Sequence, residues 1–325
     1  MPPESGLRDQ ISSFRGDFTE LAAVMQRSWG ENREQPLLYT ADFLRSAFEY
    51  PGSSDELATS IYSEDQLLAF AAGFPRRMRY DGREIRLLLI SFVTASSQVK
   101  GAGYGLSVWR ALITRARESG FDGTINFCVE GDAMNRKMPD LARLCRLNFD
   151  RIFSVEFLTR FLRPAKGDEN VPSNTQEIDL FLELAASVPA SVPLARIWTR
   201  DEAIWHCQLR CGALSVSATH DSRRGLIAGY LMDVAATPPA KVVFLDDLLW
   251  GTLTPSERKD LLTEFLRVAA LRGAQTASCP ILNYASLEPL SACGFRKSKR
   301  VLHTYLSLWN GQNPRTLGSL YVDVF

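Results

Sequence analysis

The chain has 325 residues, a length that favours two domains at about 150 residues each. Hydrophobic residues make up 46% and charged residues 23%, as in ordinary globular proteins. Lys plus Arg and Asp plus Glu number 37 each, so the chain lacks the basic surplus with which proteins grip nucleic acid. Composition therefore predicts a globular protein with no nucleic-acid partner.

Hydrophobic runs are short throughout the chain. The longest nearly unbroken one, Leu87 to Val93, falls far below the ~20 residues of a membrane-spanning helix. The N-terminal residues lack the apolar core of a secretory signal, so we expect a cytoplasmic protein without a membrane span. His206, Cys207 and Cys211 have no second ligand pair near them, so no metal is expected.

The first half shows alternating strand and helix patterns. Asp81-Gly82 is a hairpin signal, and the apolar run after it is typical of a strand buried on both faces. In chain order we expect helices over Asp17 to Glu31 and Tyr39 to Pro51, strands over Leu68 to Met78 and Glu84 to Val93, a helix from Tyr104 to Gly120, a strand over Thr124 to Val129, a helix over Asn135 to Arg146 and a strand pair from Phe149.

The second half repeats this order about 150 residues later. We expect strands over Ala213 to Thr219, Leu226 to Val234 and Val242 to Trp250, a helix ending at Gly273, a strand over Gln275 to Ile281, a helix over Asn283 to Cys293 and strands after it. A segment rich in Pro, Gly and charge separates the copies. The predicted domains are 1–165 and 175–325, joined by a linker over 166–174.

A glycine-rich loop, Gln98 to Gly103 with Gly105 beyond it, lies between a buried strand and an amphipathic helix. A helix N-terminus presents unpaired N–H groups that bind phosphate, and glycines let a pyrophosphate approach the backbone. The loop matches neither the P-loop nor the dinucleotide fingerprint but fits Q-x-x-G-x-G. The simpler alternative is a flexible turn that binds nothing.

This loop resembles the coenzyme A loop of the GNAT acyltransferase superfamily. A second GNAT-like pattern, N-x-x-A/S followed by Leu and then Gly-Phe, is matched by Asn283, Ser286, Leu290, Gly294 and Phe295. The first copy matches more loosely, at Asn135, Leu144 and Phe149, with Asn148 in place of the glycine. On these motifs the chain is similar to a tandem GNAT protein.

The resemblance implies a mixed α/β (α+β) fold with two GNAT-like domains. Each would have a central, mostly antiparallel sheet with a splayed parallel pair, flanked by helices. The resemblance also implies acetyl-CoA or another acyl-CoA as co-substrate, and no metal. The coenzyme-binding residues that it implies are Phe92, Val93, Gln98, Val99, Lys100, Gly101, Ala102, Gly103, Tyr104, Gly105 and Asn135.

The implied mechanism is direct attack of an amine on the thioester, polarised by a backbone N–H near Val93. A base must take the amine proton. Glu130 follows the strand nearest the thioester and should be partly buried there, with Asp132 as its rival. The carboxylate of the C-terminal residue Phe325 is a third candidate. A solvated loop carboxylate and a merely docked tail are the simpler alternatives.

Two expected features are missing from the sequence. GNAT proteins often carry a Tyr acid on the late helix, where this chain has Leu144 and Leu290. The loop of the second copy, Gly251 to Ser256, has no G-x-G, and Pro255 removes an N–H donor. We therefore expect the second copy to be non-catalytic, with Thr254 or Ser256 capping its helix. Strand alternation further predicts that one of the neighbouring Asp246 and Asp247 faces inward.

Three functions remain open at this point. The first is an acyl-CoA-dependent N-acyltransferase of the EC 2.3.1 type that acts on a small-molecule or peptide amine. The second is a catalytically silent GNAT-like module that binds acyl-CoA or a partner. The third is a structural interaction protein, for which the sequence offers no positive feature. A homodimer is compatible with each of them.

Overall fold

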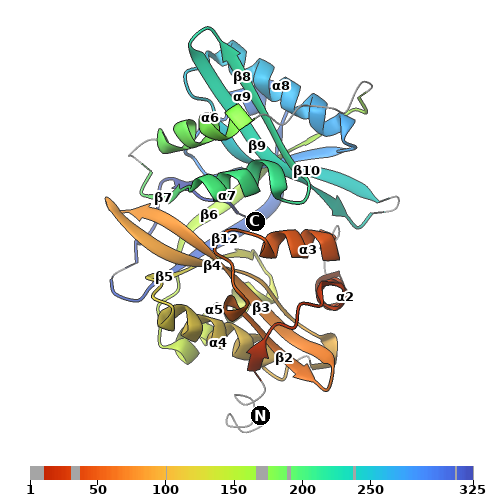
Figure 1. Cartoon of the computed structure of the whole chain (residues 1–325), viewed down its shortest axis with the longest axis vertical. Helices are drawn as coiled ribbons and strands as arrows, with labels where there is room; N and C mark the ends of the chain where they lie inside the picture. The colour runs from red at the N-terminus through yellow and green to blue at the C-terminus, as the bar shows by residue number, and fades with distance from the viewer. Residues whose placement is uncertain are drawn as a thin grey trace. The chain divides into compact units, whose positions relative to one another are not determined.

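The computed structural model describes residues 11–30, 37–99, 101–165, 175–188, 192–236, 239–311 and 313–324. Lys100, Phe325 and the predicted linker 166–174 lie outside the described residues. The chain forms two compact units (Figure 1). Unit 1 comprises the described residues within Met1–Met78, Arg83–Ser154 and Leu302–Thr316, and unit 2 comprises those within Arg79–Gly82, Val155–Val301 and Leu317–Phe325.

Unit 1 is a sheet with helices on both faces. Its strands, in the order in which they lie side by side, are β1 (Ile11–Ser13), β2 (Ala58–Ser63), β3 (Gln66–Tyr80), β4 (Arg83–Ala95), β5 (Gly123–Val129) and the second part of β12 (Arg296–Leu308). Its helices are α2 (Phe18–Gly30), α3 (Ala41–Phe48), α4 (Tyr104–Glu118) and α5 (Ala133–Cys145), with short 3₁₀ turns η1 (Asp55–Leu57) and η2 (Ser97–Val99).

Local sequence signals account for these elements. Asp81 and Gly82 both have positive φ, 48° and 72°, as a two-residue hairpin turn requires. The apolar stripe of α4 is buried against β2, β4 and β5, as its spacing predicts. Aromatic rings fill the other face of the sheet, beneath α2 and α3, which pack against each other.

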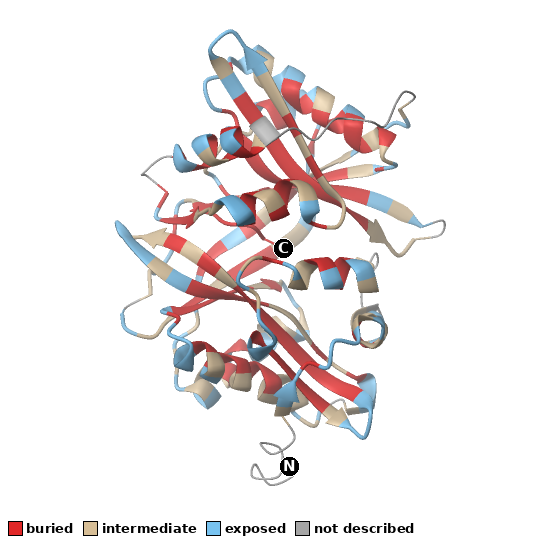
Figure 2. Ribbon diagram, viewed as in Figure 1, coloured by how far each residue is buried: buried red, intermediate tan, exposed pale blue. Residues whose placement is uncertain are grey.

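From β8 onward, unit 2 follows the order of strands and α-helices that unit 1 shows from β2 onward. Its sheet contains part of β6 (Asp150–Phe161), then β11 (Thr276–Ile281), β10 (Ala240–Leu249), β9 (Arg223–Val234) and β8 (Ala213–His220), in that order. A separate parallel pair joins β7 (Leu194–Ile197) to β13 (Leu320–Tyr321). Its helices are α6 (Thr175–Ala186), α7 (Arg200–Ile204), the π-helical turn η3 (Trp205–Leu209), α8 (Pro255–Leu271) and α9 (Glu288–Ala292). Figure 2 shows β9 and β10 buried along most of their length.

Identical backbone hydrogen bonds end the long helix in each unit. Phe121 N–H donates to the Ala116 carbonyl after α4, and Ala274 N–H donates to the Ala269 carbonyl after α8. The glycines between helix and strand, Gly120 and Gly273, have φ of 73° and 88°, which a side chain would oppose. Both predicted helix stops are confirmed.

The compact units differ from the contiguous ranges 1–165 and 175–325 in their last strands. Residues 156–161 of β6 pair with β11 in unit 2, and residues 302–308 of β12 pair with β5 in unit 1. Each half of the sequence thus supplies the closing strand of the other half's sheet. The pairing satisfies the N–H and C=O groups that β5 and β11 would otherwise leave at an open edge.

Two sequence expectations need correction, and a third is confirmed. The helix expected over Asn283 to Cys293 is only α9, because Asn283 has a left-handed φ of 61° and residues up to Leu287 form an irregular loop. The strand pair expected from Phe149 is the single strand β6. The docked C-terminal tail is confirmed, since residues 320–324 are buried, but only Leu320–Tyr321 pair as a strand.

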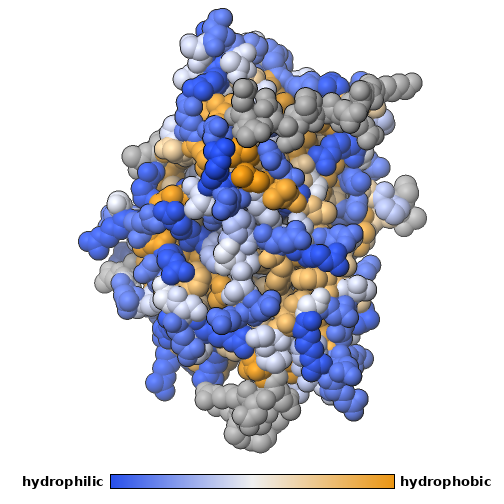
Figure 3. Space-filling view, viewed as in Figure 1, coloured by the Kyte–Doolittle hydropathy of each residue, from blue (hydrophilic) through white to orange (hydrophobic). Residues whose placement is uncertain are grey.

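No helix among the described residues is long and apolar enough to span a bilayer. On the face drawn in Figure 3, hydrophilic and hydrophobic residues are interspersed.

The crossed strands lead to a prediction about fragments. A fragment 1–165 keeps β5 but lacks the strand residues Leu302–Leu308 that pair with it. We expect this fragment to unfold without a cooperative thermal transition and to bind a hydrophobic dye, because the edge and the apolar face of β5 are uncovered. A peptide of residues 296–316, added in trans, should restore a cooperative transition by circular dichroism.

The control is the same peptide carrying Leu306→Asp, since Leu306 is fully buried opposite Ile125 and a charge there cannot be accommodated. A cooperative transition in fragment 1–165 alone would contradict the expectation.

Candidate coenzyme site

The parallel strands β4 and β5 of unit 1 form a fork. They pair from Leu87 opposite Gly123 to Ile90 opposite Asn126, and both strands continue beyond that point without pairing to each other. Ile90 and Val93 both pack into the core beneath α4, although residues three positions apart in a regular strand face opposite sides of the sheet. The strand therefore bulges between them, and Phe92 there has a left-handed φ of 54°. Beyond the fork, the backbone N–H groups of β4 that face β5 no longer find a partner on β5. The bulge lies in this unpaired stretch.

The glycine loop joins this fork to the N-terminus of α4. Gly101 and Gly103 have φ of 86° and 82°, which favours glycine, and Gly103 is the N-cap residue of α4 without any capping side chain. The first-turn N–H groups, including those of Tyr104 and Gly105, have no intrahelical acceptor, and the N-cap glycine offers them no side-chain acceptor. An anion placed there would receive these bonds and the favourable end of the helix dipole.

Other predicted loop residues have local backbone bonds. Val99 N–H donates to the Ser96 carbonyl, Ala102 N–H donates to the Val99 carbonyl, and Gln98 N–H lies 3.4 Å from Ser96 Oγ. These bonds shape the loop. They leave the glycines and the start of α4 as the groups best placed to hold a phosphate.

Glu130 directly follows β5, and the structure gives it a partner that the sequence analysis missed. Its Oε1 lies 3.6 Å from Nε2 of His303, whose Nδ1 is 3.1 Å from Ser154 Oγ. The Glu130 side chain is 63% exposed, so the burial expected for it is absent, whereas that of His303 is only 6% exposed. Burial, and then the positive charge of Arg151, lower the pKa of His303 below 6.5, so its imidazole is neutral at pH 7.

Asp132 and Asn135 lie at the start of α5. Asp132 is the N-cap residue of that helix. Asn135 Oδ1 accepts a 2.6 Å hydrogen bond from the hydroxyl of Tyr305, a second residue that the sequence analysis missed. Burial raises the pKa of Tyr305, which keeps its proton in place at neutral pH.

His303 and Tyr305 lie on one face of β12, opposite Cys128 and Asn126 of β5. Strand alternation in the sequence could have placed the two side chains together. Strand alternation could not have predicted that these two side chains lie beside β5 and α5, because β12 comes from the other half of the sequence.

Unit 2 contains a similar fork that is arranged differently. Strands β10 and β11 pair from Val242 opposite Thr276 to Phe244 opposite Ser278, and the register of β10 shifts at Asp246. Because a bulge places two successive residues on one side, Asp246 and Asp247 are both buried, at 5% and 2% exposure. Strand alternation predicted an inward position for one of them, and the bulge adds the second.

Buried partners hold both carboxylates. Asp247 accepts a 2.8 Å bond from the Tyr321 hydroxyl and lies 2.7 Å from Nε2 of His206. Asp246 pairs with Arg210 at 2.8 Å. Burial, partly offset by Arg210, raises the pKa of Asp246 to about 6. These bonds join β10 to the π-helical turn and to the C-terminal tail.

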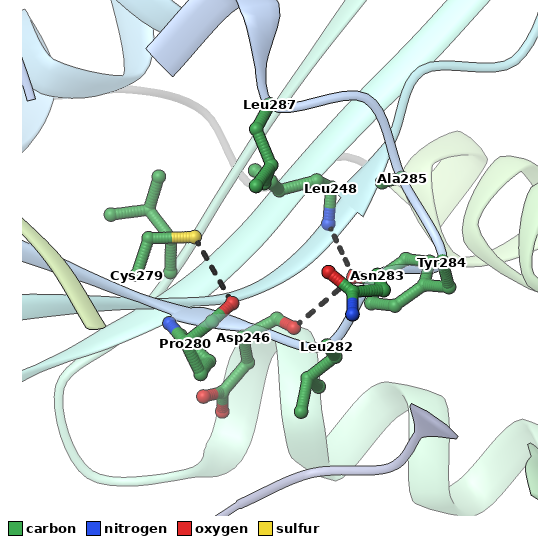
Figure 4. Close-up of a pocket in the computed structure, with 10 residues that line it drawn as sticks. Asp246, Leu248, Cys279, Pro280, Leu282, Asn283, Tyr284, Ala285 and Leu287 are labelled. Atoms are coloured by element: carbon green, nitrogen blue, oxygen red, sulfur yellow. Dashed lines mark hydrogen bonds between the residues drawn. The ribbon is translucent and has the colours of Figure 1, made fainter. Parts of the chain in front are cut away.

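The hydroxyl of Tyr284 closes the fork of unit 2 (Figure 4). It accepts a 2.9 Å hydrogen bond from Leu248 N–H and lies 3.4 Å from the Asp246 carbonyl, to which it can donate. Leu248 is six residues after the first paired residue, Val242, as Val93 is six after Leu87. Tyr284 thus satisfies the N–H that corresponds to Val93, and the pocket beside it has an empty volume of only about 220 Å³.

The start of α8 in unit 2 is closed as well. Thr254 caps the helix, as predicted, and Glu257 accepts a 2.8 Å bond from Thr254 N–H in a capping box. Hydrogen bonds from Arg223, then from Thr254, lower the pKa of Glu257 to about 2. This helix end therefore already holds a carboxylate, which would repel a phosphate.

The described residues contain no cluster of three His, Cys, Asp or Glu side chains that could hold a metal ion. His206, the centre of the weak metal pattern in the sequence, instead contacts Asp247 and the rings of Phe181 and Trp198.

Comparison with known proteins bears on the fold alone. Neither protein-family models nor curated protein sequences match this chain. Among solved structures, an N-myristoyltransferase from Saccharomyces cerevisiae, solved with bound myristoyl-CoA, superposes with a TM-score of 0.71 at 12% identity, over 91% of this chain and 82% of that one.

Two GCN5-related N-acetyltransferases are also similar. The one from Kribbella flavida has a TM-score of 0.52 at 16% identity, over 92% of this chain and 70% of that one. The one from Anabaena variabilis has a TM-score of 0.55 at 13% identity, over 92% and 73%. These likenesses show that the chain has a GNAT-like fold.

Proposed function

We propose that unit 1 is an acyl-CoA-dependent N-acyltransferase site and that unit 2 keeps the same fold without a coenzyme site. The contrast between the two forks carries this proposal. In unit 2, Tyr284 satisfies the N–H of the bulged strand and Glu257 closes the helix end. In unit 1 the corresponding helix end carries two left-handed glycines and no side-chain cap.

The coenzyme would lie along β4. Its pyrophosphate would receive N–H bonds from Gly101, Gly103, Tyr104 and Gly105 at the start of α4. Its pantetheine arm would enter the fork beside β4, where β5 has separated from it. The N–H of Val93 would then polarise the thioester carbonyl, as a donor aimed at the charge that develops during attack. The Tyr284 hydroxyl on Leu248 N–H supports this assignment, because it places an oxygen in the equivalent position of unit 2.

The amine of the acceptor would attack the thioester carbon directly. The C–N bond forms, the C–S bond breaks, and the amine proton passes to the Glu130–His303 pair, directly or through water. The neutral imidazole of His303 and the carboxylate beside it support this role. Asp132 is the rival carboxylate, and the carboxylate of Phe325 remains a third candidate.

Tyr305 is our proposal for the acid that protonates the departing thiolate. Leu144 and Leu290 stand where a GNAT protein often has that tyrosine, whereas the Tyr305 hydroxyl reaches the start of α5 from β12. Its hydrogen bond to Asn135 supports the role, because Asn135 is one of the implied coenzyme-binding residues.

The substrate classes follow from the fold neighbours only as proposals. These neighbours are N-acetyltransferases and an N-myristoyltransferase. The donor would therefore be acetyl-CoA or a longer acyl-CoA, and the acceptor would be a small-molecule or peptide amine. The alternative, a silent module that binds acyl-CoA without turnover, predicts coenzyme binding but no acyl transfer to any amine in a panel.

The glycine loop gives the first test. Calorimetry with coenzyme A should show about one site per chain, because the start of α4 has no side-chain cap, whereas Thr254 and Glu257 close the start of its counterpart α8. Gly101→Val and Gly103→Val place a side chain where the phosphate would lie, and each should weaken binding by about tenfold or more.

Gly120→Val is the matched control. Gly120 also has positive φ and open space around it, but it lies at the opposite end of α4. This variant should lose stability by a similar amount and keep its affinity for coenzyme A. Two equivalent sites, or equal affinity in all three variants, would count against the proposed site.

Glu130→Gln tests the base. The change preserves the shape and removes the charge, so kcat/KM with an accepted amine should fall by about 100-fold while affinity for coenzyme A stays the same. Because the Glu130 carboxylate raises the pKa of His303, its loss should also move the acidic limb of the pH profile to lower pH. Asp132→Asn is the control; a larger loss in that variant would transfer the role to Asp132.

Tyr305→Phe tests the acid. The variant keeps the ring and loses the hydroxyl, so we expect kcat to fall by about tenfold or more with little change in coenzyme affinity. Tyr62→Phe removes a hydroxyl elsewhere in unit 1, one that accepts a bond from Arg15 N–H, and should leave kcat unchanged. Full turnover in Tyr305→Phe would mean that the thiolate leaves without this acid.

A further inference from the structure

We propose that the Phe92 ring sets the length of the acyl group that the unit 1 site accepts and restricts it to short chains. The inference rests on the proposed function of this fork and adds the residue that decides its acyl specificity.

The depth of the fork limits the space ahead of the thioester. If Val93 N–H binds the thioester carbonyl, the acyl group points toward Ile90, where β4 and β5 pair again. That stretch is three residues long, or ~10 Å at the rise of a strand. A longer chain must therefore leave the plane of the sheet through one of its two faces.

The face beneath α4 is closed. Ile90 and Cys128 are buried there in one close-packed core with Val108, Trp109 and Leu141. A close-packed core has no room for added methylene groups without displacing its side chains. The acyl chain must turn toward the opposite face, beneath α2 and α3.

Phe92 lies on that opposite face, at the bulge itself. Its ring packs edge-on against Tyr39 at 5.7 Å and Phe74 at 5.8 Å between centroids. Behind these rings, Phe74 contacts Phe48, and Tyr39 contacts Trp29 and Phe43. The contacts form a continuous aromatic wall with Phe92 as its member nearest the fork.

The backbone of Phe92 supports a functional role for the ring. A bulky residue with a φ of 54° is unusual and strained, and such strain is found at binding sites more often than elsewhere. The equivalent residue of unit 2, five positions after the first pair in each fork, is Asp247. There β10 also bulges, without a positive φ, and directs a carboxylate into a polar network, so a bulge at this place in the fork does not require an aromatic ring.

The test measures the binding of coenzyme A and its thioesters, because a binding measurement does not require the acceptor amine to be known. Dissociation constants for coenzyme A, acetyl-CoA and octanoyl-CoA are measured by calorimetry on the full chain and on Phe92→Ala. In the native chain we expect octanoyl-CoA to bind at least tenfold more weakly than acetyl-CoA. In Phe92→Ala that ratio should fall by about tenfold, since a few methylene groups buried in the vacated space suffice for such a change.

Two controls separate chain length from general damage. Phe92→Leu keeps most of the bulk and should keep the preference for acetyl-CoA. Phe161→Ala removes a ring that is 88% exposed and should change nothing. If Phe92→Ala does not fold, Phe92→Gly replaces it, because glycine relieves the positive φ.

The possible outcomes are distinct. Octanoyl-CoA binding to the native chain as tightly as acetyl-CoA, or an unchanged ratio in the Phe92 variants, would overturn the role of Phe92 and leave the proposed function standing. If coenzyme A and both thioesters fail to bind, the proposed function itself is wrong.

Discussion

Separation of two parallel strands is the physical constraint on which the rest of this structure depends. Where β4 leaves β5, and where β10 leaves β11, buried backbone N–H groups lose the partner that a continuous sheet would give them. Such groups are costly unless another acceptor reaches them. A bulge in β4 and in β10 directs two successive residues to one face and so shapes what can approach the gap.

The two units answer this constraint differently. Unit 2 supplies its own acceptor, the hydroxyl of Tyr284, and its own anion, the carboxylate of Glu257 at the start of α8. Its bulge carries Asp246 and Asp247, which need Arg210, His206 and Tyr321 as buried partners. The result is a closed polar network that fixes the C-terminal tail. Unit 1 instead combines an aromatic residue at the bulge with glycines at the helix end, an arrangement suited to an external ligand.

Crossing of the last strands adds a second consequence. Because residues 302–308 pair with β5, the His303 and Tyr305 side chains come to lie beside Glu130 and Asn135 of unit 1. The Tyr305 hydroxyl thus contacts Asn135 from a position 170 residues farther along the chain. Under the proposed function, Tyr305 from the second half of the sequence supplies the hydroxyl that is missing at Leu144.

The sequence by itself determined the elements and the unequal loops. Periodicity and glycine stops located α4, α8 and the buried strands, because these signals are local and repeat at the spacing of the structure. Pro255 and the absent glycines marked the closed loop of unit 2 for the same reason. Only the tertiary structure decided which strand lies beside β5, that Tyr284 fills one fork, and that both Asp246 and Asp247 are buried. Strand pairing joins residues that are far apart in the sequence, so a local pattern cannot predict which strands pair. A bulge shifts the alternation of side chains between the two faces of a strand, so the same pattern cannot predict which residues beyond it are buried.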